Sequence, residues 1–150
     1  RVLGSLSYGA GGWEHASIRM LATGTVEVIT GTAPHGQGHE TCWSMIAAEK
    51  LGVDPADVDV LHSDTAIAPY GLDTYGSRSL PVGGVAIANA CDGVIDKARQ
   101  IAAHQLEANP DDLEFSGGGF RVTGSPDTET PLAAAAWAAF TSRLRPLGPP

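Results

Sequence analysis

The chain contains too few cysteines and too few basic residues for several classes of protein. Only Cys42 and Cys91 are present, and their positions match neither a zinc knuckle nor a disulfide framework. Both fall within predicted helices, where a free cysteine usually behaves as a small buried hydrophobic residue. The 9 lysines and arginines against 17 acidic residues give a formal net charge of −8. This balance disfavours nonspecific nucleic-acid or anionic-membrane binding, so we expect no nucleic-acid partner.

Long apolar segments are also absent, and we expect no membrane span. No segment has the pattern of a signal peptide, so we expect a cytoplasmic protein. The chain begins with Arg1 instead of methionine, which suggests a fragment, a processed chain or a trimmed chain. Its 150 residues, 43% of them hydrophobic, are enough for one domain with a packed core.

Hydrophobic periodicity predicts an α+β fold in the order β-β-α-β-α-β-β-α. Residues 1–14 are rich in glycine and serine and predict an irregular lead-in, residues 15–142 contain the regular elements, and residues 143–150 predict a flexible tail. Thr130 before Pro131 is expected to cap the last helix. The expected elements are a hairpin at 16–28, a helix at 40–51, a strand at 58–62, a helix at 81–102, a hairpin at 113–122 and a helix at 131–140.

The segment 32–43, TAPHGQGHETCW, contains two histidines just before a predicted helix. On a continuous helix, the spacing of His35 and His39 would place both rings on one face, as in helical zinc sites. Gly36 and Gly38 disfavour a helix between them. Ligand spacing without the helical geometry is weak evidence, so we expect no metal ligand from this pair.

The same Gly-Gln-Gly turn is better suited to an anionic or polar ligand. A glycine turn that opens a helix exposes N–H groups at the positive end of the helix dipole. The amide of Gln37 offers both a donor and an acceptor. A plain turn, with Glu40 favouring the first helical turn, explains the segment equally well when it is taken alone.

A long segment without periodicity, residues 63–80, precedes the second main helix. Loops of this length inside a compact domain are usually functional or disordered, and the regular elements predicted on both sides favour function. Its sequence GLDTYGSRSLP places donor-rich and small residues together, at Gly76, Ser77, Arg78 and Ser79. The alternative is that Arg78 forms a surface ion pair and that the serines are caps.

Three motifs in matching order and spacing resemble the molybdenum-binding large subunit of the xanthine dehydrogenase and aldehyde oxidase family. They are GTAPHGQGHET, LGVDPADVDVLHSDT and PYGLDTYGSRSLPVGG. The branch they are most similar to is typified by the aerobic carbon monoxide dehydrogenase large subunit. GGWEHASIRM and DLEFSGGGFRV also resemble that family, so the resemblance runs from about Gly11 to Val122.

The resemblance implies a partial molybdopterin-binding domain. Gln37 would lie near the molybdenum oxo ligand as a hydrogen-bond donor, in a supporting catalytic role. Gly76 would lie beside the metal, and His39 and Thr41 would serve the pterin or its phosphates. The pterin is expected in its cytosine dinucleotide form, and its dithiolene sulfurs hold molybdenum without a protein ligand. The implied cofactor-binding residues are His35, Gly36, Gln37, Gly38, His39, Thr41, Gly76, Ser77, Arg78 and Ser79.

The resemblance also implies that this chain is inactive alone. The family hydroxylates carbon centres using water, or oxidises carbon monoxide, with a glutamate base near the end of a much longer subunit. No glutamate of this chain matches that base, and the substrate-selecting loop is missing too. The remainder of the large subunit, an iron–sulfur subunit carrying [2Fe–2S] clusters and an FAD subunit are the implied partners.

Asp73 departs from the family pattern, because a glycine is expected before Thr-Tyr-Gly-Ser-Arg-Ser. Its carboxylate would add bulk and charge beside an anionic cofactor. The alternative function is therefore a non-catalytic remnant, or an α+β domain that binds only a partner. Molybdenum and pterin analysis of the purified complex separates the two.

Overall fold

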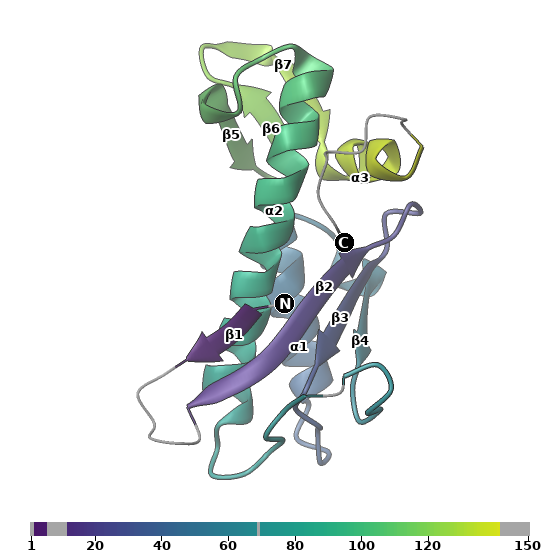
Figure 1. Ribbon diagram of the computed structural model, residues 1–150, viewed down its shortest axis with the longest axis vertical. Helices are drawn as coiled ribbons and strands as arrows, with labels where there is room; N and C mark the ends of the chain where they lie inside the picture. The colour runs from purple at the N-terminus through teal and green to yellow at the C-terminus, as the bar shows by residue number, and fades with distance from the viewer. Residues whose placement is uncertain (1, 6–11, 69, 142–150) are drawn as a thin grey trace.

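A computed structural model describes residues 2–5, 12–68 and 70–141 (Figure 1). The described part contains strands, α-helices and short 3₁₀ or π-helical turns. In chain order they are β1 (Val2–Ser5), β2 (Trp13–Met20), β3 (Val26–Thr30), α1 (His39–Leu51), the 3₁₀ turn η2 (Pro55–Asp57), β4 (Val58–Leu61), the π-helical turn η3 (Ser79–Gly83), α2 (Gly84–Leu106), the 3₁₀ turn η4 (Pro110–Asp112), β5 (Leu113–Ser116), β6 (Gly119–Val122), β7 (Ser125–Pro131) and α3 (Leu132–Thr141).

Two small sheets share one long helix. The first sheet has the strand order β1-β2-β3-β4, in which β3 and β4 are parallel and the other neighbours are antiparallel. The second sheet, β5-β6-β7, is antiparallel and lies at the opposite end of the molecule. Helix α2 runs past both sheets and contacts β1, β2 and α1 at one end and α3 and β7 at the other (Figure 1).

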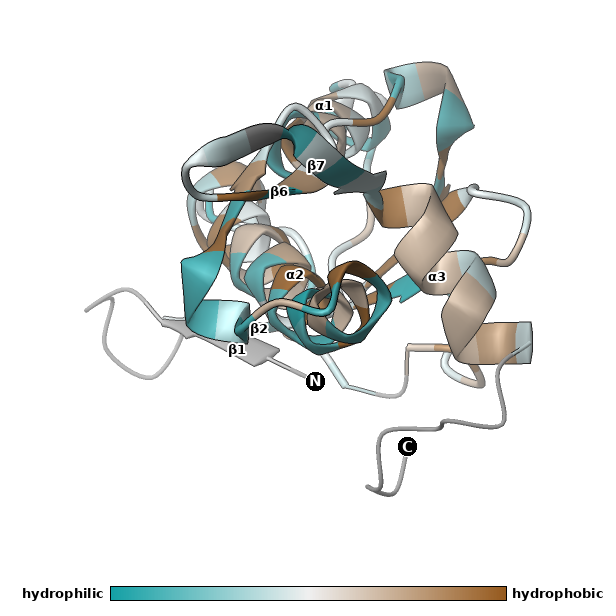
Figure 2. Ribbon diagram, turned by 90° about the horizontal axis from the view of Figure 1, so that it is seen from above, coloured by the Kyte–Doolittle hydropathy of each residue, from teal (hydrophilic) through white to brown (hydrophobic). Residues whose placement is uncertain are grey.

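The core lies where α1 and α2 pack on the first sheet. Val26 and Val28 alternate along β3 and are completely buried, as the period of two in a half-buried strand requires. Trp43 and Leu51 of α1 are buried against them, as is Ile87 of α2. Burial of each such large side chain contributes about 1.5–3 kcal/mol. In the view of Figure 2, α2 carries both hydrophilic and hydrophobic positions, whereas α3 is apolar along most of its length.

The hairpin at 16–28, the helix at 40–51 and the strand at 58–62 are confirmed within a residue or a few at each end. Gly52 ends α1 with a left-handed backbone, φ 67°, as expected of a glycine at that position. The α+β class is confirmed as well. None of the helices in the described part of the chain is long and apolar enough to cross a bilayer.

The lead-in at 1–14 is not wholly irregular. It contains β1 and the first residues of β2, with Val2 opposite Ala16 and Ser5 opposite Trp13. Edge pairing through the backbone needs no apolar alternation, so the composition gave no signal for it. The predicted tail at 143–150 falls outside the described residues.

The cap predicted at Thr130 is wrong, and the start of α2 is shifted by three residues from the expected one. Thr130 belongs to β7, a strand absent from the predicted order, and its hydroxyl donates to Gln105 Oε1 at 3.3 Å instead of capping α3. Pro81 lies within the π-helical turn, and α2 begins at Gly84. At the start of α3 a tertiary hydrogen bond marks the boundary. The Leu132 N–H, at the start of α3, donates to the Gly118 carbonyl of the β5–β6 turn at 2.8 Å.

Cys91 is buried in α2, whereas Cys42 of α1 is partly exposed. Burial raises the pKa of the Cys91 thiol from 9.0 to about 12, and the nearby Asp92 adds to the effect. At pH 8 we therefore expect iodoacetamide to alkylate Cys42 at least about tenfold faster than Cys91 in the native chain. Peptide mass spectrometry measures both rates, and equal rates would contradict the burial of Cys91.

The same shift predicts a loss of stability in alkali. The Cys91 thiol has a pKa near 9.0 in the unfolded chain and about 12 in the folded chain. Its contribution to the free energy of unfolding is therefore fully present below pH 9. It then decreases as the pH rises toward 12. A Cys91→Ala variant should show a weaker decrease of the free energy of unfolding across this range.

Candidate functional site

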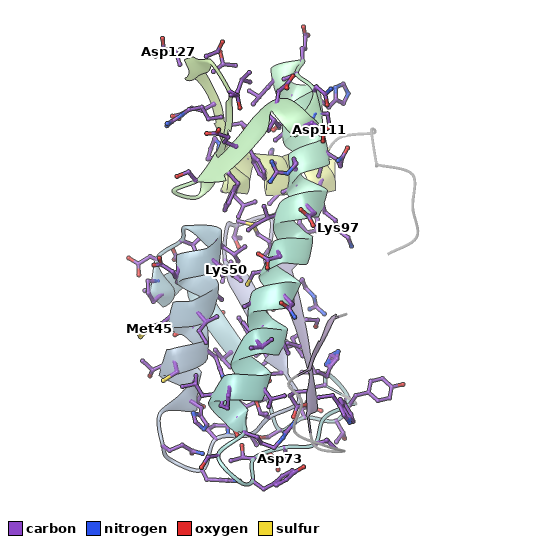
Figure 3. The ribbon with its side chains drawn as sticks, turned by 90° about the vertical axis from the view of Figure 1, so that its left-hand side faces the viewer. Met45, Lys50, Asp73, Lys97, Asp111 and Asp127 are labelled. Carbon is purple, nitrogen blue, oxygen red and sulfur yellow. The ribbon has the colours of Figure 1, made fainter. Side chains whose placement is uncertain are left out.

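The two sequence motifs meet at one edge of the first sheet. The first loop, residues 31–38, leaves β3 and leads into α1. The second loop, residues 70–78, follows β4 and leads through the π-helical turn into α2. Because β3 and β4 are parallel, their carboxyl ends lie at the same edge, the lower end of Figure 1. In Figure 3, Asp73 of the second loop lies at the opposite end of the molecule from Asp127 of β7.

Hydrogen bonds join the loops directly. The Ala33 N–H donates to Asp73 Oδ1 at 2.8 Å, and the Thr74 hydroxyl donates to the Ala33 carbonyl at 2.5 Å. The Ser79 hydroxyl donates in turn to Thr74 Oγ1 at 2.6 Å. Ala33 thus has both its backbone groups satisfied by the second loop, which fixes the two loops relative to each other.

Gly31 and Gly71 cross at a distance that no side chain allows. A Cβ atom added to Gly71 would lie 2.6 Å from Gly31 Cα, and one added to Gly31 would lie 2.7 Å from Gly71 Cα. Neither glycine is among the predicted site residues. For Gly31 the available signal was its position directly after β3, because a glycine at a strand often marks close approach of another backbone.

Trp43 of α1 connects the start of that helix to the π-helical turn. Its ring is completely buried, and Nε1–H donates to the Ser79 carbonyl at 3.4 Å. The His39 ring lies against it, with centroids 5.2 Å apart. The start of α1 is therefore held to the π-helical turn that precedes α2.

The first loop presents left-handed glycines to open space. Gly36 and Gly38 have φ angles of 90° and 78°, which favour glycine, and an added Cβ would meet no atom within 4 Å at either residue. Gln37 is exposed between them, and its Oε1 accepts the His35 N–H. With Oε1 engaged in this way, the Nε2 donors of the amide are left for another acceptor. Among the described residues, no protein acceptor takes the Nε2 donors of Gln37.

The start of α1 is a second source of donors. Gly38 occupies the N-cap position, and no side chain caps it. The first N–H groups of any helix lack intrahelical acceptors, so those near Thr41 suit an anion such as a phosphate. Glu40 also lies at this helix start, where its carboxylate is hydrogen-bonded to His62 Nε2 at 2.8 Å.

The second loop also has exposed left-handed residues. Gly76 and Ser77 have φ angles of 55° and 60°, and an added Cβ at Gly76 would meet nothing within 4 Å. Asp73 has a φ of 64°, a conformation that favours the glycine expected there from the resemblance. Aspartate can nevertheless occupy this position, because it tolerates the left-handed conformation and its carboxylate accepts the Ala33 N–H.

Two of the predicted site residues face inward. Arg78 and Ser79 are only 4% and 1% exposed. Arg78 Nη1 donates to Glu14 Oε2 at 2.6 Å, so its ion pair is buried and not on the surface as the alternative interpretation supposed. The other predicted residues, from His35 to Thr41 and at Gly76 and Ser77, are exposed or partly exposed.

The chemistry of this edge fits an anionic, hydrogen-bonding group. It combines unhindered glycines, amide donors and a helix start, and beside it lies a cavity of about 370 Å³ lined partly by Thr30, Gly31, Tyr70 and Asp73. In the described residues, no cluster of three histidine, cysteine or acidic side chains is placed to hold a metal ion. A ligand here would be held by hydrogen bonds and the helix dipole.

Comparison with known proteins identifies the family. The model of the molybdopterin cofactor-binding domain matches residues 3–147. Over 132 residues, 88% of this chain and 16% of the relative, the chain is 43% identical to the carbon monoxide dehydrogenase large chain of Hydrogenophaga pseudoflava. It is 41% identical, over 90% of its own length and 17% of the relative's, to the 6-hydroxypseudooxynicotine dehydrogenase complex subunit gamma of Paenarthrobacter nicotinovorans.

A solved structure agrees with the sequence relatives. Reconstituted CO dehydrogenase from Oligotropha carboxidovorans superposes with a TM-score of 0.85 at 42% identity, covering 93% of this chain and 18% of that chain. The family expected from the motifs is thus confirmed. The present chain spans 16–18% of the length of these relatives.

The glycine crossing predicts the effect of a small substitution. Gly71→Ala should lower the free energy of unfolding by about 1–3 kcal/mol, because its methyl group must push the loops apart. The matched control is Gly93→Ala within α2, where an added Cβ meets nothing within 4 Å. That change should stabilise the chain by about 0.5–1 kcal/mol through helix propensity. Urea unfolding compares the two, and a Gly71→Ala variant as stable as wild type would refute the crossing.

Proposed function

The chain belongs to the molybdopterin cofactor-binding domain family, and from this premise we propose that its two loops form one wall of a molybdenum cofactor site. The observation that supports this best is the joining of the loops through Ala33, Asp73 and Thr74, which presents both glycine turns at one edge. When bound, the cofactor would supply the two-electron oxidation chemistry. The chain's own residues bind and orient it.

The proposed roles follow from exposure and donor chemistry. Gln37 would offer its Nε2 donors to the metal centre, because its Oε1 accepts the His35 N–H. The N–H groups at the start of α1, beside His39 and Thr41, would donate hydrogen bonds to the phosphates. Gly36, Gly38 and Gly76, together with Ser77, let the ligand approach the backbone closely. Arg78 and Ser79 support the loop from within.

The whole enzyme that we propose is a molybdenum hydroxylase that oxidises an aldehyde, a purine or carbon monoxide. The cofactor would be the cytosine dinucleotide form of molybdopterin. The remainder of the large subunit would supply the glutamate base and the substrate loop. Partner chains or domains would supply [2Fe–2S] clusters and FAD, and the complex would work in the cytoplasm. The 150-residue chain alone would be inactive.

The cofactor content of the purified complex distinguishes the proposed function from the alternative, a remnant that binds no cofactor. Molybdenum analysis and pterin fluorescence of the purified complex should detect both groups bound to the wild-type protein. Their absence from a complex that contains all subunits would favour the remnant. The left-handed φ of Asp73 and its hydrogen bond with Ala33 weaken the argument for the remnant that rests on Asp73.

Gln37→Ala should reduce the turnover of the assembled complex by about 100-fold, the usual effect of removing one donor aimed at developing charge. The fold and the molybdenum content should change little, because the side chain is exposed. The matched control is Gln100→Ala, which truncates an exposed glutamine on α2. Steady-state dye reduction with the substrate that the wild-type complex oxidises measures both variants. Undiminished turnover of Gln37→Ala would remove this residue from the site.

A further inference from the structure

Glu14 of β2 is a carboxylate with no exposed surface, located beneath the second loop. Burying a charge is costly unless it is paired and hydrogen-bonded. Both oxygens of Glu14 are engaged. Oε1 accepts the His15 N–H at 2.9 Å, and the Leu72 N–H lies 3.3 Å from Oε1 and 3.2 Å from Oε2. Arg78 Nη1 donates to Oε2 at 2.6 Å.

The Arg78 guanidinium joins two chain segments, β2 and the second loop, within the same network. Besides Glu14, its Nη1 donates to the Asp73 carbonyl at 2.5 Å, and its Nη2 donates to the Trp13 carbonyl. The cation also lies 5.2 Å from the centroid of the Tyr75 ring. Only a planar fork of donors reaches acceptors in these different directions at once.

The network therefore holds both ends of the exposed turn. Leu72 on one side and Arg78 on the other are bound by one carboxylate. Between them, Asp73, Gly76 and Ser77 have left-handed backbone angles. Such conformations are unfavourable for residues other than glycine and persist only where the surrounding structure enforces them. The buried pair supplies that enforcement.

The first loop begins beside the same carboxylate. A Cβ atom added to Gly31 would lie 2.5 Å from Glu14 Oε1, so only a glycine fits there. The Gly31 N–H donates to the carbonyl of His15, the residue after Glu14, at 3.0 Å. One carboxylate is thus in contact with the entrance of both loops.

We propose that Glu14 is a positioning residue for the cofactor wall, acting through Arg78 and the Leu72 amide to set the conformation and spacing of the two loops. Being completely buried, it does not touch the ligand itself. The assignment to a cofactor rests on the proposed function. The setting of the loops is a property of the chain without any ligand, so it can be tested separately.

The first test is amide hydrogen exchange of the full chain without cofactor. Glu14→Gln keeps the shape of the side chain but presents an amide to Arg78 in place of a charge. We expect exchange in residues 31–38 and 70–78 to accelerate about tenfold or more, with residues 113–122 of the second sheet unchanged. Arg78→Lys keeps the charge but loses the fork, and should give the same pattern.

Leu132→Ala is the control for general destabilisation. Leu132 is 1% exposed and belongs to α3, which packs against α2 and β7. It should accelerate exchange around the second sheet and leave the loops protected. The proposal is overturned if the Glu14 and Arg78 variants leave loop exchange within twofold of wild type, accelerate exchange uniformly, or both unfold the chain entirely.

The second test measures molybdenum and pterin per chain in the assembled complex. Glu14→Gln should reduce both severalfold, whereas Leu132→Ala with a similar loss of thermal stability should retain them. Equal losses in the two variants would show that stability alone decides retention and would overturn the positioning role. If the wild-type complex contains neither group, the proposed function fails, while the exchange experiment still decides whether Glu14 sets the loops.

Discussion

The parallel pairing of β3 with β4 is the constraint on which the rest of the arrangement depends. It places the carboxyl ends of both strands at one edge, so the segments that follow them in sequence must meet there. The helices α1 and α2 then return along the sheet, which directs both of their N-terminal ends toward the same edge. Two donor-rich segments about 40 residues apart in sequence thereby become one surface.

Buried contacts between the two loops and the core hold that surface in place. Close backbone crossing at Gly31 and Gly71, the Trp43 ring and the buried pair of Glu14 and Arg78 hold the loops, while the left-handed residues face outward. The division matters for the proposed function, because a rigid loop that presents donors loses little conformational entropy when a ligand binds. The charged pair of Glu14 and Arg78 is buried, whereas the backbone of the left-handed glycines is exposed to a ligand.

Periodicity was enough to predict the elements that bury one face. The 16–28 hairpin, α1, β4 and the apolar stripe of α2 follow from alternation or helical spacing. β1 and β7 escaped prediction because their pairing depends on backbone hydrogen bonds and not on a pattern of side chains. The inward position of Arg78 was also invisible, since its partner Glu14 lies 64 residues away in sequence. The motifs indicated which segments matter, and only the fold showed which side chains face a ligand.

The most direct measurement of the central claim is a hydrogen-exchange comparison of the assembled protein with and without molybdopterin. If the two loops form one cofactor wall, residues 33–41 and 72–79 should both become protected when the cofactor is bound, and residues 113–122 should be unaffected. Protection of only one loop, or of neither, would contradict the account.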